Sequence, residues 1–175
     1  MNYLKNLLLI AAVLCAFASC AVAQVSSTSA VYVARQAADQ SVTSSTTLVD
    51  SDNLKVSVAA NKKYYYRVFA PFALDGVVSG YKFQLTLPSG IAHIIQDDQV
   101  LNGITSTIVL IRIDITVTII SGALASSGDH VLLIEGSFEN GVNAGDVKLQ
   151  FAQNTSDGSA ITLKKGAVLF VSPVN

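Results

Sequence analysis

Residues 107–119 read TIVLIRIDITVTI, and this stretch decides the fold class. Apolar residues occupy every second position: Val109, Ile111, Ile113, Ile115, Val117 and Ile119. A period of two is typical of a β-strand, and β-branched side chains favour strand over helix. The stretch therefore predicts one long strand. The intervening positions begin with Ile108 and Leu110, which predicts that one end of this strand is covered on both faces.

Shorter strands are predicted on either side, at residues 31–36, 42–49, 54–58, 64–72, 81–87, 131–138, 147–151, 161–163 and 168–171. Asp157-Gly158 predicts a hairpin turn. Pro71 is expected to end its strand or to place it at a sheet edge, because proline donates no ladder hydrogen bond. With about nine or ten strands and no amphipathic helix, the sequence predicts an all-β antiparallel sandwich or jelly roll.

The N-terminal segment predicts export. Lys5 precedes an apolar run at residues 7–17, and Ala21 and Ala23 frame a cleavage site before Gln24. That run is too short for a transmembrane span, which needs roughly 20 apolar residues. We therefore expect a signal peptide at 1–23, a flexible lead-in at 24–30 and a single domain at 31–175, in a protein that is secreted or held at the cell surface. Lipidation of Cys20, with anchoring or periplasmic retention, is the alternative.

Composition excludes several classes of function. Lys and Arg total 11 against 12 Asp and Glu, which is too balanced for a nucleic-acid-binding protein. Both cysteines, Cys15 and Cys20, lie in the predicted leader. A processed chain would therefore contain no cysteine nucleophile, zinc–thiolate site or iron–sulfur cluster.

Catalytic and metal sites are not expected. His93 lies in the apolar segment IAHII, typical of a half-buried sheet residue, and His130 follows Asp129 in a predicted loop with Ser126 and Ser127. A Ser/Asp/His set there lacks the surrounding motif of a nucleophile elbow. The oxygen-rich stretches at 50–53 and 97–98 are interpreted as solvated turns, because calcium needs six to eight oxygen ligands. No catalytic residue, cofactor or metal is predicted.

Tyr64-Tyr65-Tyr66 is the one concentration of aromatic residues. In a strand, Tyr64 and Tyr66 share a face, and Tyr65 shares the other with Arg67. The Tyr64/Tyr66 face either fills the core or forms an exposed surface that stacks on sugars or binds a partner. Tyr64, Tyr66, Arg67, Ile108 and Leu110 are therefore the candidate binding or interface residues. Asn154-Thr155-Ser156 also matches a glycosylation sequon.

Two parts of the chain resemble a β-sandwich module of small phage virion proteins. The first is residues 41–68 with 80–90, and the second is residues 135–171, which contain GDVKL, AQNTSD and LKKG in that order. The resemblance implies a jelly roll whose closing strand packs into the centre of the sandwich. It also implies an oligomeric structural or attachment role on a particle surface, without catalysis.

Two functional hypotheses follow. The first is an exported, non-catalytic structural or interaction protein that self-assembles or decorates a surface or particle. Its low charge predicts exposed apolar patches that a second copy, or another surface protein, would cover. The alternative is a secreted carbohydrate-binding or adhesive module that uses the Tyr64/Tyr66 face or the loop at 126–130.

Overall fold

The computed structural model describes residues 30–91, 93–102, 106–113, 119–122, 124 and 127–174. These residues form twelve strands: β1 (Tyr32–Arg35), β2 (Gln40–Thr43), β3 (Val49–Val58), β4 (Lys63–Leu74), β5 (Tyr81–Thr86), β6 (His93–Asn102), β7 (Ser106–Ile113), β8 (Ile119–Gly122), β9 (Gly128–Glu139), β10 (Gly145–Ala152), β11 (Ala160–Leu163) and β12 (Val168–Val174). No helix in the described part of the chain is long and apolar enough to cross a membrane.

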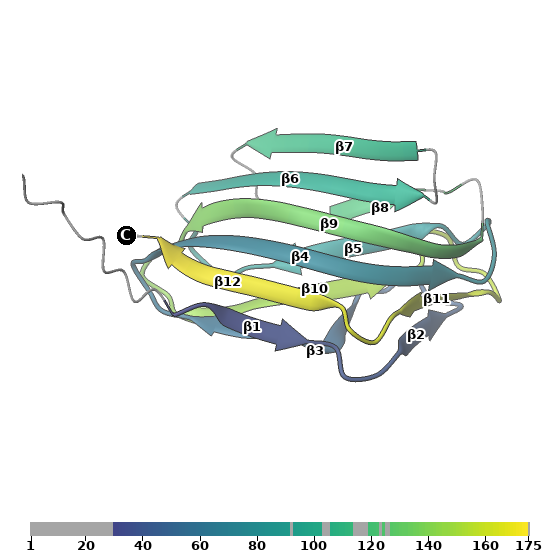
Figure 1. The fold of residues 1–175 in the computed structure, drawn as a ribbon, viewed down its shortest axis with the longest axis horizontal. Coiled ribbons are helices and arrows are strands. Elements are labelled where there is room, and N and C mark those ends of the chain that lie inside the picture. Colours follow the sequence, from purple (N-terminus) through teal and green to yellow (C-terminus); the bar gives the residue numbers. More distant parts are fainter. Residues whose placement is uncertain are drawn as a thin grey trace, which may run out of the picture.

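The strands form two antiparallel sheets that pack face to face (Figure 1). The smaller sheet has the order β3-β10-β5-β8, and the main path of the larger sheet is β1-β12-β4-β9-β6-β7. Strands β3 to β10 pair as a folded ribbon, first with last: β3 with β10, β4 with β9, β5 with β8, and β6 with β7. This pairing is that of a jelly roll, so the predicted fold class is confirmed.

The long strand predicted at 107–119 is two strands in the structure. Its first part is β7, at the edge of the larger sheet, whereas Ile119 begins β8, which pairs with β5 in the smaller sheet. Residues 114–118 lie outside the described residues. The prediction was wrong because strands of both sheets alternate with the same period. An unbroken period-two pattern therefore does not reveal where the chain crosses from one sheet to the other.

Strand β6 was not predicted. It pairs with β7 on one side and β9 on the other, although Asp97 and Asp98 lie in its centre. Aspartate is rare in strands, so its presence obscured the pattern. The stretch at 97–98 is therefore part of a strand and not a turn.

Pro71 lies within an interior strand, contrary to the prediction. β4 continues through Pro71 to Leu74 and pairs with β9 along its whole length. On its other side, β4 pairs with β12 up to Phe69 and with β11 from Phe72. Pro71 therefore lies opposite the connection between β11 and β12, and its carbonyl accepts a hydrogen bond from the amide of Lys164. The amide hydrogen that proline lacks would point into this break, where no ladder bond is lost.

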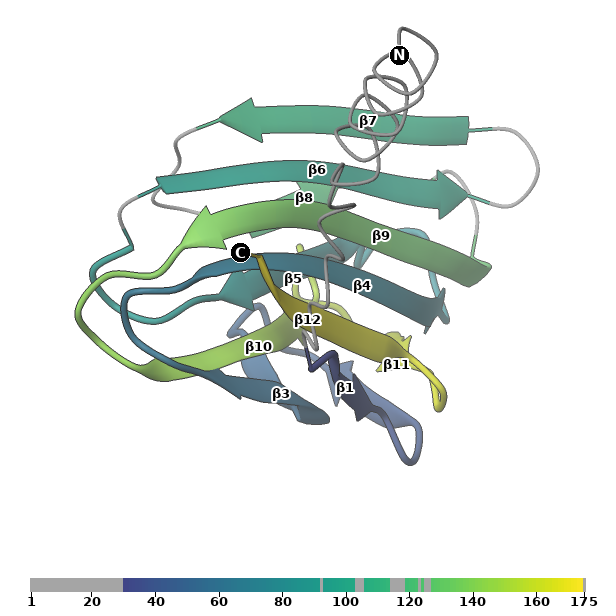
Figure 2. The same cartoon turned by 60° about the vertical axis from the view of Figure 1, so that its left-hand side comes forward.

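The four remaining strands extend the larger sheet. β12 lies between β1 and β4 (Figure 2), and its Leu169 and Val171 are fully buried. β11 lies between β4 and β2. The predicted hairpin at Asp157-Gly158 is not present, because this segment links β10 of the smaller sheet to β11 of the larger one.

The core fills the space between the two sheets. The alternation predicted from sequence is confirmed in three strands, where Leu54, Val56 and Val58, then Tyr81, Phe83 and Leu85, then Val147, Leu149 and Phe151 are buried. Phe72 of the larger sheet packs against Tyr81 and Phe83 of the smaller one, with ring centroids 5.8 and 5.0 Å apart. Aromatic contacts of this kind join the sheets and hold their outward faces in place.

Candidate interaction surface

The side of the larger sheet that points away from the core is the most distinctive surface of the molecule. Cross-strand pairing places side chains of five strands on this surface, and we call fifteen of the described ones the outer face. They are Val33 of β1; Phe170 and Ser172 of β12; Tyr65, Arg67, Phe69 and Pro71 of β4; Val131, Leu133, Glu135 and Ser137 of β9; and Ile95, Asp97, Gln99 and Leu101 of β6.

The outer face exposes large apolar side chains. Tyr65 is 37% exposed, Phe69 42%, Phe170 37% and Ile95 42%. Where β3, β5 and β10 form it, the corresponding face of the smaller sheet is polar, because the described residues that alternate with the buried ones are Lys55, Ser57, Lys82, Gln84, Thr86, Lys148 and Gln150. Antiparallel sheets commonly turn a polar face to water. The larger sheet departs from this pattern, and the smaller sheet follows it.

A row of charged side chains crosses the centre of the outer face. Arg67 of β4 lies opposite Glu135 of β9, and Asp97 of β6 lies opposite Glu135 on its other side. Arg67 Nε is 3.5 Å from Glu135 Oε2. Burial, together with the neighbouring carboxylate of Glu135, raises the pKa of Tyr65 above its usual value. Asp97 and Glu135 are like charges directly opposite one another, which is an unfavourable pairing in a sheet. The row contains two carboxylates and one guanidinium, so acidic groups are in excess.

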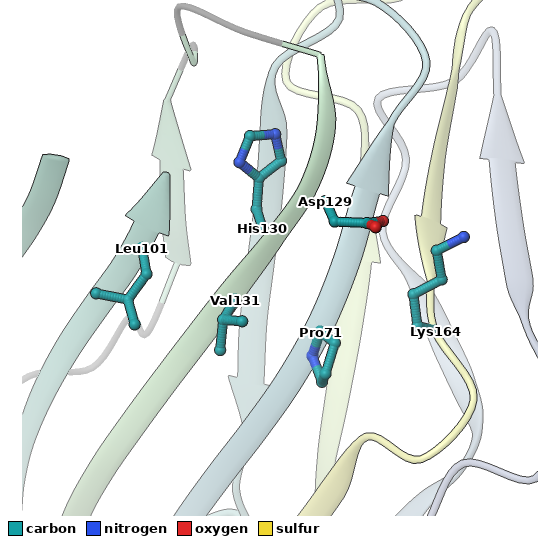
Figure 3. A pocket seen from close by; sticks show the side chains of 6 residues that line it. All are labelled: Pro71, Leu101, Asp129, His130, Val131 and Lys164. Atoms are coloured by element: carbon teal, nitrogen blue, oxygen red, sulfur yellow. The ribbon is translucent and has the colours of Figure 1, made fainter. Parts of the chain in front are cut away.

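Two hollows lie on this surface. One, of about 290 Å³, lies around Tyr65, Asp97, Glu135 and Ser137. The other, of about 440 Å³, has an apolar floor formed by Pro71, Leu101 and Val131, and its rim carries Asp129 and Lys164. Figure 3 shows the Lys164 ammonium directed away from the Asp129 carboxylate; that ammonium lies 3.5 Å from Asp39 Oδ2. Both hollows are largely open to solvent.

Tyr64 and Tyr66 are not part of any surface. They are 4% and 0% exposed, and the Tyr64 ring stacks on Phe138 with centroids 5.3 Å apart. The Tyr66 hydroxyl donates a 2.8 Å hydrogen bond to Gln96. Of the two alternatives for this face, the structure therefore supports core filling, and Tyr64 and Tyr66 are not available as binding or interface residues. The exposed tyrosine is Tyr65, which the same period-two alternation already placed on the face of Arg67.

The other candidate interface residues have separate outcomes. Arg67 lies at the centre of the outer face, as described above. Ile108 and Leu110 lie in β7, paired with Val100 and Asp98 of β6. The side chains of Ile108 and Leu110 lie outside the described residues, as does that of His93 in β6.

The structure does not bring a Ser/Asp/His set together among the described residues. His130 is in strand β9 and not in a loop, and its ring packs on Phe72 with centroids 5.3 Å apart. Asp129 precedes it in the same strand, so the two side chains point to opposite faces. Ser127 is exposed, and Ser126 lies outside the described residues.

The oxygen-rich stretch at 50–53 belongs to strand β3 and not to a turn. Asp50 accepts hydrogen bonds from Lys148 at 2.6 Å and from Gln150 at 2.5 Å, and these contacts lower its pKa. Within the described part of the chain, no group of three or more acidic, histidine or cysteine side chains is placed to hold a metal ion. Asn154 of the sequon is exposed in the connection between β10 and β11.

Known proteins offer only distant likenesses. No family model matches the chain, and no curated protein matches it significantly. Among solved structures, a chain of infectious bursal disease virus, Gt strain, is 9% identical, with a TM-score of 0.24 over 84% of this chain and 42% of the viral one. The VP2 subviral particle of the same virus gives 11% identity and a TM-score of 0.23 over 84% and 40%. This chain thus spans about two fifths of these viral chains, and TM-scores this low do not establish a shared fold.

Proposed function

We propose that this protein is an exported, non-catalytic structural or interaction protein that self-assembles or decorates a surface. The observation that supports the proposal is the difference between its two outward sheet faces. Strands β3, β5 and β10 of the smaller sheet present lysine, glutamine, serine and threonine among their described side chains, whereas the larger sheet presents Tyr65, Phe69, Phe170 and Ile95. Large apolar side chains exposed together on one sheet face are typical of an interaction site.

Burial of such a surface provides the driving force for association. Removing apolar area from water contributes about 25 cal/mol per Å² before the entropic cost of association is subtracted. The charged row of Arg67, Glu135 and Asp97 in its centre would supply orientation more than affinity. A rigid two-sheet sandwich that presents one adhesive face is suited to assembly, and its function would need no catalytic group.

The experiment is to express the full chain and analyse the protein recovered outside the cytoplasm. Intact mass would show cleavage before Gln24 if the leader is a signal peptide, or a lipid on Cys20 if the chain is anchored. Light scattering over a dilution series would then give the mass in solution. We expect a stable dimer or larger closed assembly. A monomer at every concentration would overturn self-assembly, and retention of the uncleaved chain in the cytoplasm would overturn export.

Carbohydrate binding is the second candidate function. Tyr65 is the tyrosine of the three that is exposed and could stack on a sugar ring. This ring is exposed beside the Glu135 and Asp97 carboxylates and the Ser137 hydroxyl. An aromatic ring with nearby hydrogen-bond acceptors is the kind of site that stacks on a sugar. A glycan screen with the recovered protein tests this function. Binding that Tyr65→Ala abolishes, in a protein that stays monomeric, would favour this candidate over self-assembly.

A further inference from the structure

We propose that the outer face of the larger sheet packs against the same face of a second copy, related by a two-fold axis that runs along the strands between β4 and β9. This inference rests on the proposed self-assembly and names its partner, its surface and its geometry. Three properties of the outer face support it: its area, its charge pattern and the position of its apolar residues.

The size of the outer face matches that of a stable interface. Six strands lie side by side from β1 to β7, and at a spacing of about 4.8 Å they span about 24 Å. The central strands β4 and β9 each have 12 residues, which corresponds to about 40 Å at about 3.3 Å per residue. The face therefore covers on the order of 900 Å², and a standard protein interface buries about 800 Å² on each partner.

The charge pattern selects both the partner and the axis. Arg67 lies on the β4 side of the proposed axis and Glu135 on the β9 side, in the same cross-strand row. A half-turn about an axis along the strands exchanges the two sides, so Arg67 of each copy faces Glu135 of the other. The other possible axis lies in the plane of the interface and runs across the strands. A half-turn about it, through the row of Arg67 and Glu135, would place Arg67 against Arg67 and Glu135 against Glu135. Electrostatic complementarity therefore favours the first arrangement.

At one end of the face, the same operation matches apolar residues with one another. Phe69 and Leu133 are cross-strand neighbours on the two sides of the axis, and so are Pro71 and Val131. After the half-turn, Phe69 of one copy faces Leu133 of the other, and Pro71 faces Val131. An isologous interface has this property, since each residue pair occurs twice. Two sheets packed in this way would lie about 10 Å apart with their strands at about −30°.

The competing surface is the free edge of β1. Val31, Tyr32 and Val33 are exposed there, and an uncovered edge strand is able to pair with another chain. This edge has only four residues, however, and the outer face offers a larger apolar area. Edge pairing is therefore one of the outcomes that the experiment distinguishes.

The experiment uses charge reversal in the recovered protein, with the dissociation constant measured by sedimentation or light scattering. Arg67→Glu or Glu135→Arg alone should weaken self-association by at least about tenfold, because each reversal creates two like-charge contacts across the axis. An equimolar mixture of the two single variants should restore association, since residue 67 of one variant then meets an opposite charge at residue 135 of the other. The double variant Arg67→Glu/Glu135→Arg should also associate.

Lys55→Glu is the matched control. Lys55 forms an exposed ion pair with Asp146 on the smaller sheet, at 3.7 Å, and its reversal should leave association within about twofold of the unaltered protein. Circular dichroism of each variant checks that it folds. If association survives the reversals but is lost in Tyr32→Asp, whose side chain lies on the opposite side of β1 from the outer face, the partner binds the β1 edge and this inference is wrong while self-assembly stands. If the unaltered protein is a monomer at every concentration, both proposals fail.

Discussion

The Tyr66 hydroxyl of β4 reaches across strand β9 and donates a 2.8 Å hydrogen bond to Gln96 Oε1 of β6. Both side chains are fully buried. The residue of β9 that pairs with both of them is Gly136. A Cβ atom there would lie 2.6 Å from the Tyr66 hydroxyl oxygen, so the absence of a side chain at Gly136 is what leaves room for this contact.

Gly136→Ala is therefore expected to destabilise the fold. The added methyl group would meet Tyr66 and the carbonyl of Ile95, and overpacking of this kind costs about 1–3 kcal/mol. Tyr66→Phe should cost about 1 kcal/mol through loss of the hydrogen bond. Urea unfolding followed by circular dichroism measures both. Gly158→Ala is the control, because nothing lies within 4 Å of a Cβ placed at Gly158. Equal stabilities for Gly136→Ala and the unaltered protein would contradict the packing described here.

The three consecutive tyrosines should differ in their contribution to stability. Tyr64→Ala and Tyr66→Ala remove fully packed core rings and should each cost about 3–5 kcal/mol, as large-to-small aromatic changes do. Tyr65→Ala lies on the outer face and should change the unfolding free energy by less than about 1 kcal/mol. Chemical denaturation of the three variants under conditions that keep them monomeric gives the comparison. A large loss for Tyr65→Ala alone would reverse the assignment of faces.

Leu169 and Phe170 are neighbours in β12 that point to opposite faces. Leu169 is fully buried, so Leu169→Asp places an unpaired charge in the core and should prevent folding. Phe170→Asp places the same charge on the outer face and should leave the fold intact while weakening self-association. Soluble yield, circular dichroism and solution mass of the two variants provide the measurement. The prediction fails if Leu169→Asp folds as well as Phe170→Asp.

Acidification should reduce stability through Asp50. Hydrogen bonds from Lys148 and then Gln150 lower the pKa of Asp50 in the folded protein. A carboxyl group with a lowered folded-state pKa stabilises the protein above its unfolded pKa of about 3.9, and this stabilisation is lost as the pH falls through the lowered value. The unfolding free energy should therefore fall below about pH 4.

Asp50→Asn should make that acid dependence shallower, because it removes one of the groups responsible. Asp52→Asn, the same change two residues along β3, is the matched control. Thermal unfolding between pH 2 and pH 6 tests the comparison. Identical pH profiles for Asp50→Asn and the unaltered protein would show that the Lys148–Asp50 contact does not contribute to stability in solution.

Local pattern was enough to predict the fold class and much of the core. The alternation of Leu54, Val56 and Val58, and of Tyr81, Phe83 and Leu85, predicted which side of each strand is buried, and the structure confirms it. A strand has only two faces, so a period of two separates the buried side from the exposed one without knowledge of the neighbouring strands. The same reasoning placed Tyr65 and Arg67 together on the face opposite Tyr64 and Tyr66.

The pairing of strands was decided by the tertiary structure alone. β7 and β8 read as one strand because alternation is the same in both sheets, and Pro71 lies in an interior strand because a break between β11 and β12 happens to face it. The candidate interface likewise depends on β4, β6, β9 and β12 lying side by side, although they are far apart in the chain. Burial is a property of single strands and can be read from sequence. Which strands lie next to one another depends on contacts between segments that are distant in the chain. The free energies of those contacts cannot be inferred from the local sequence pattern.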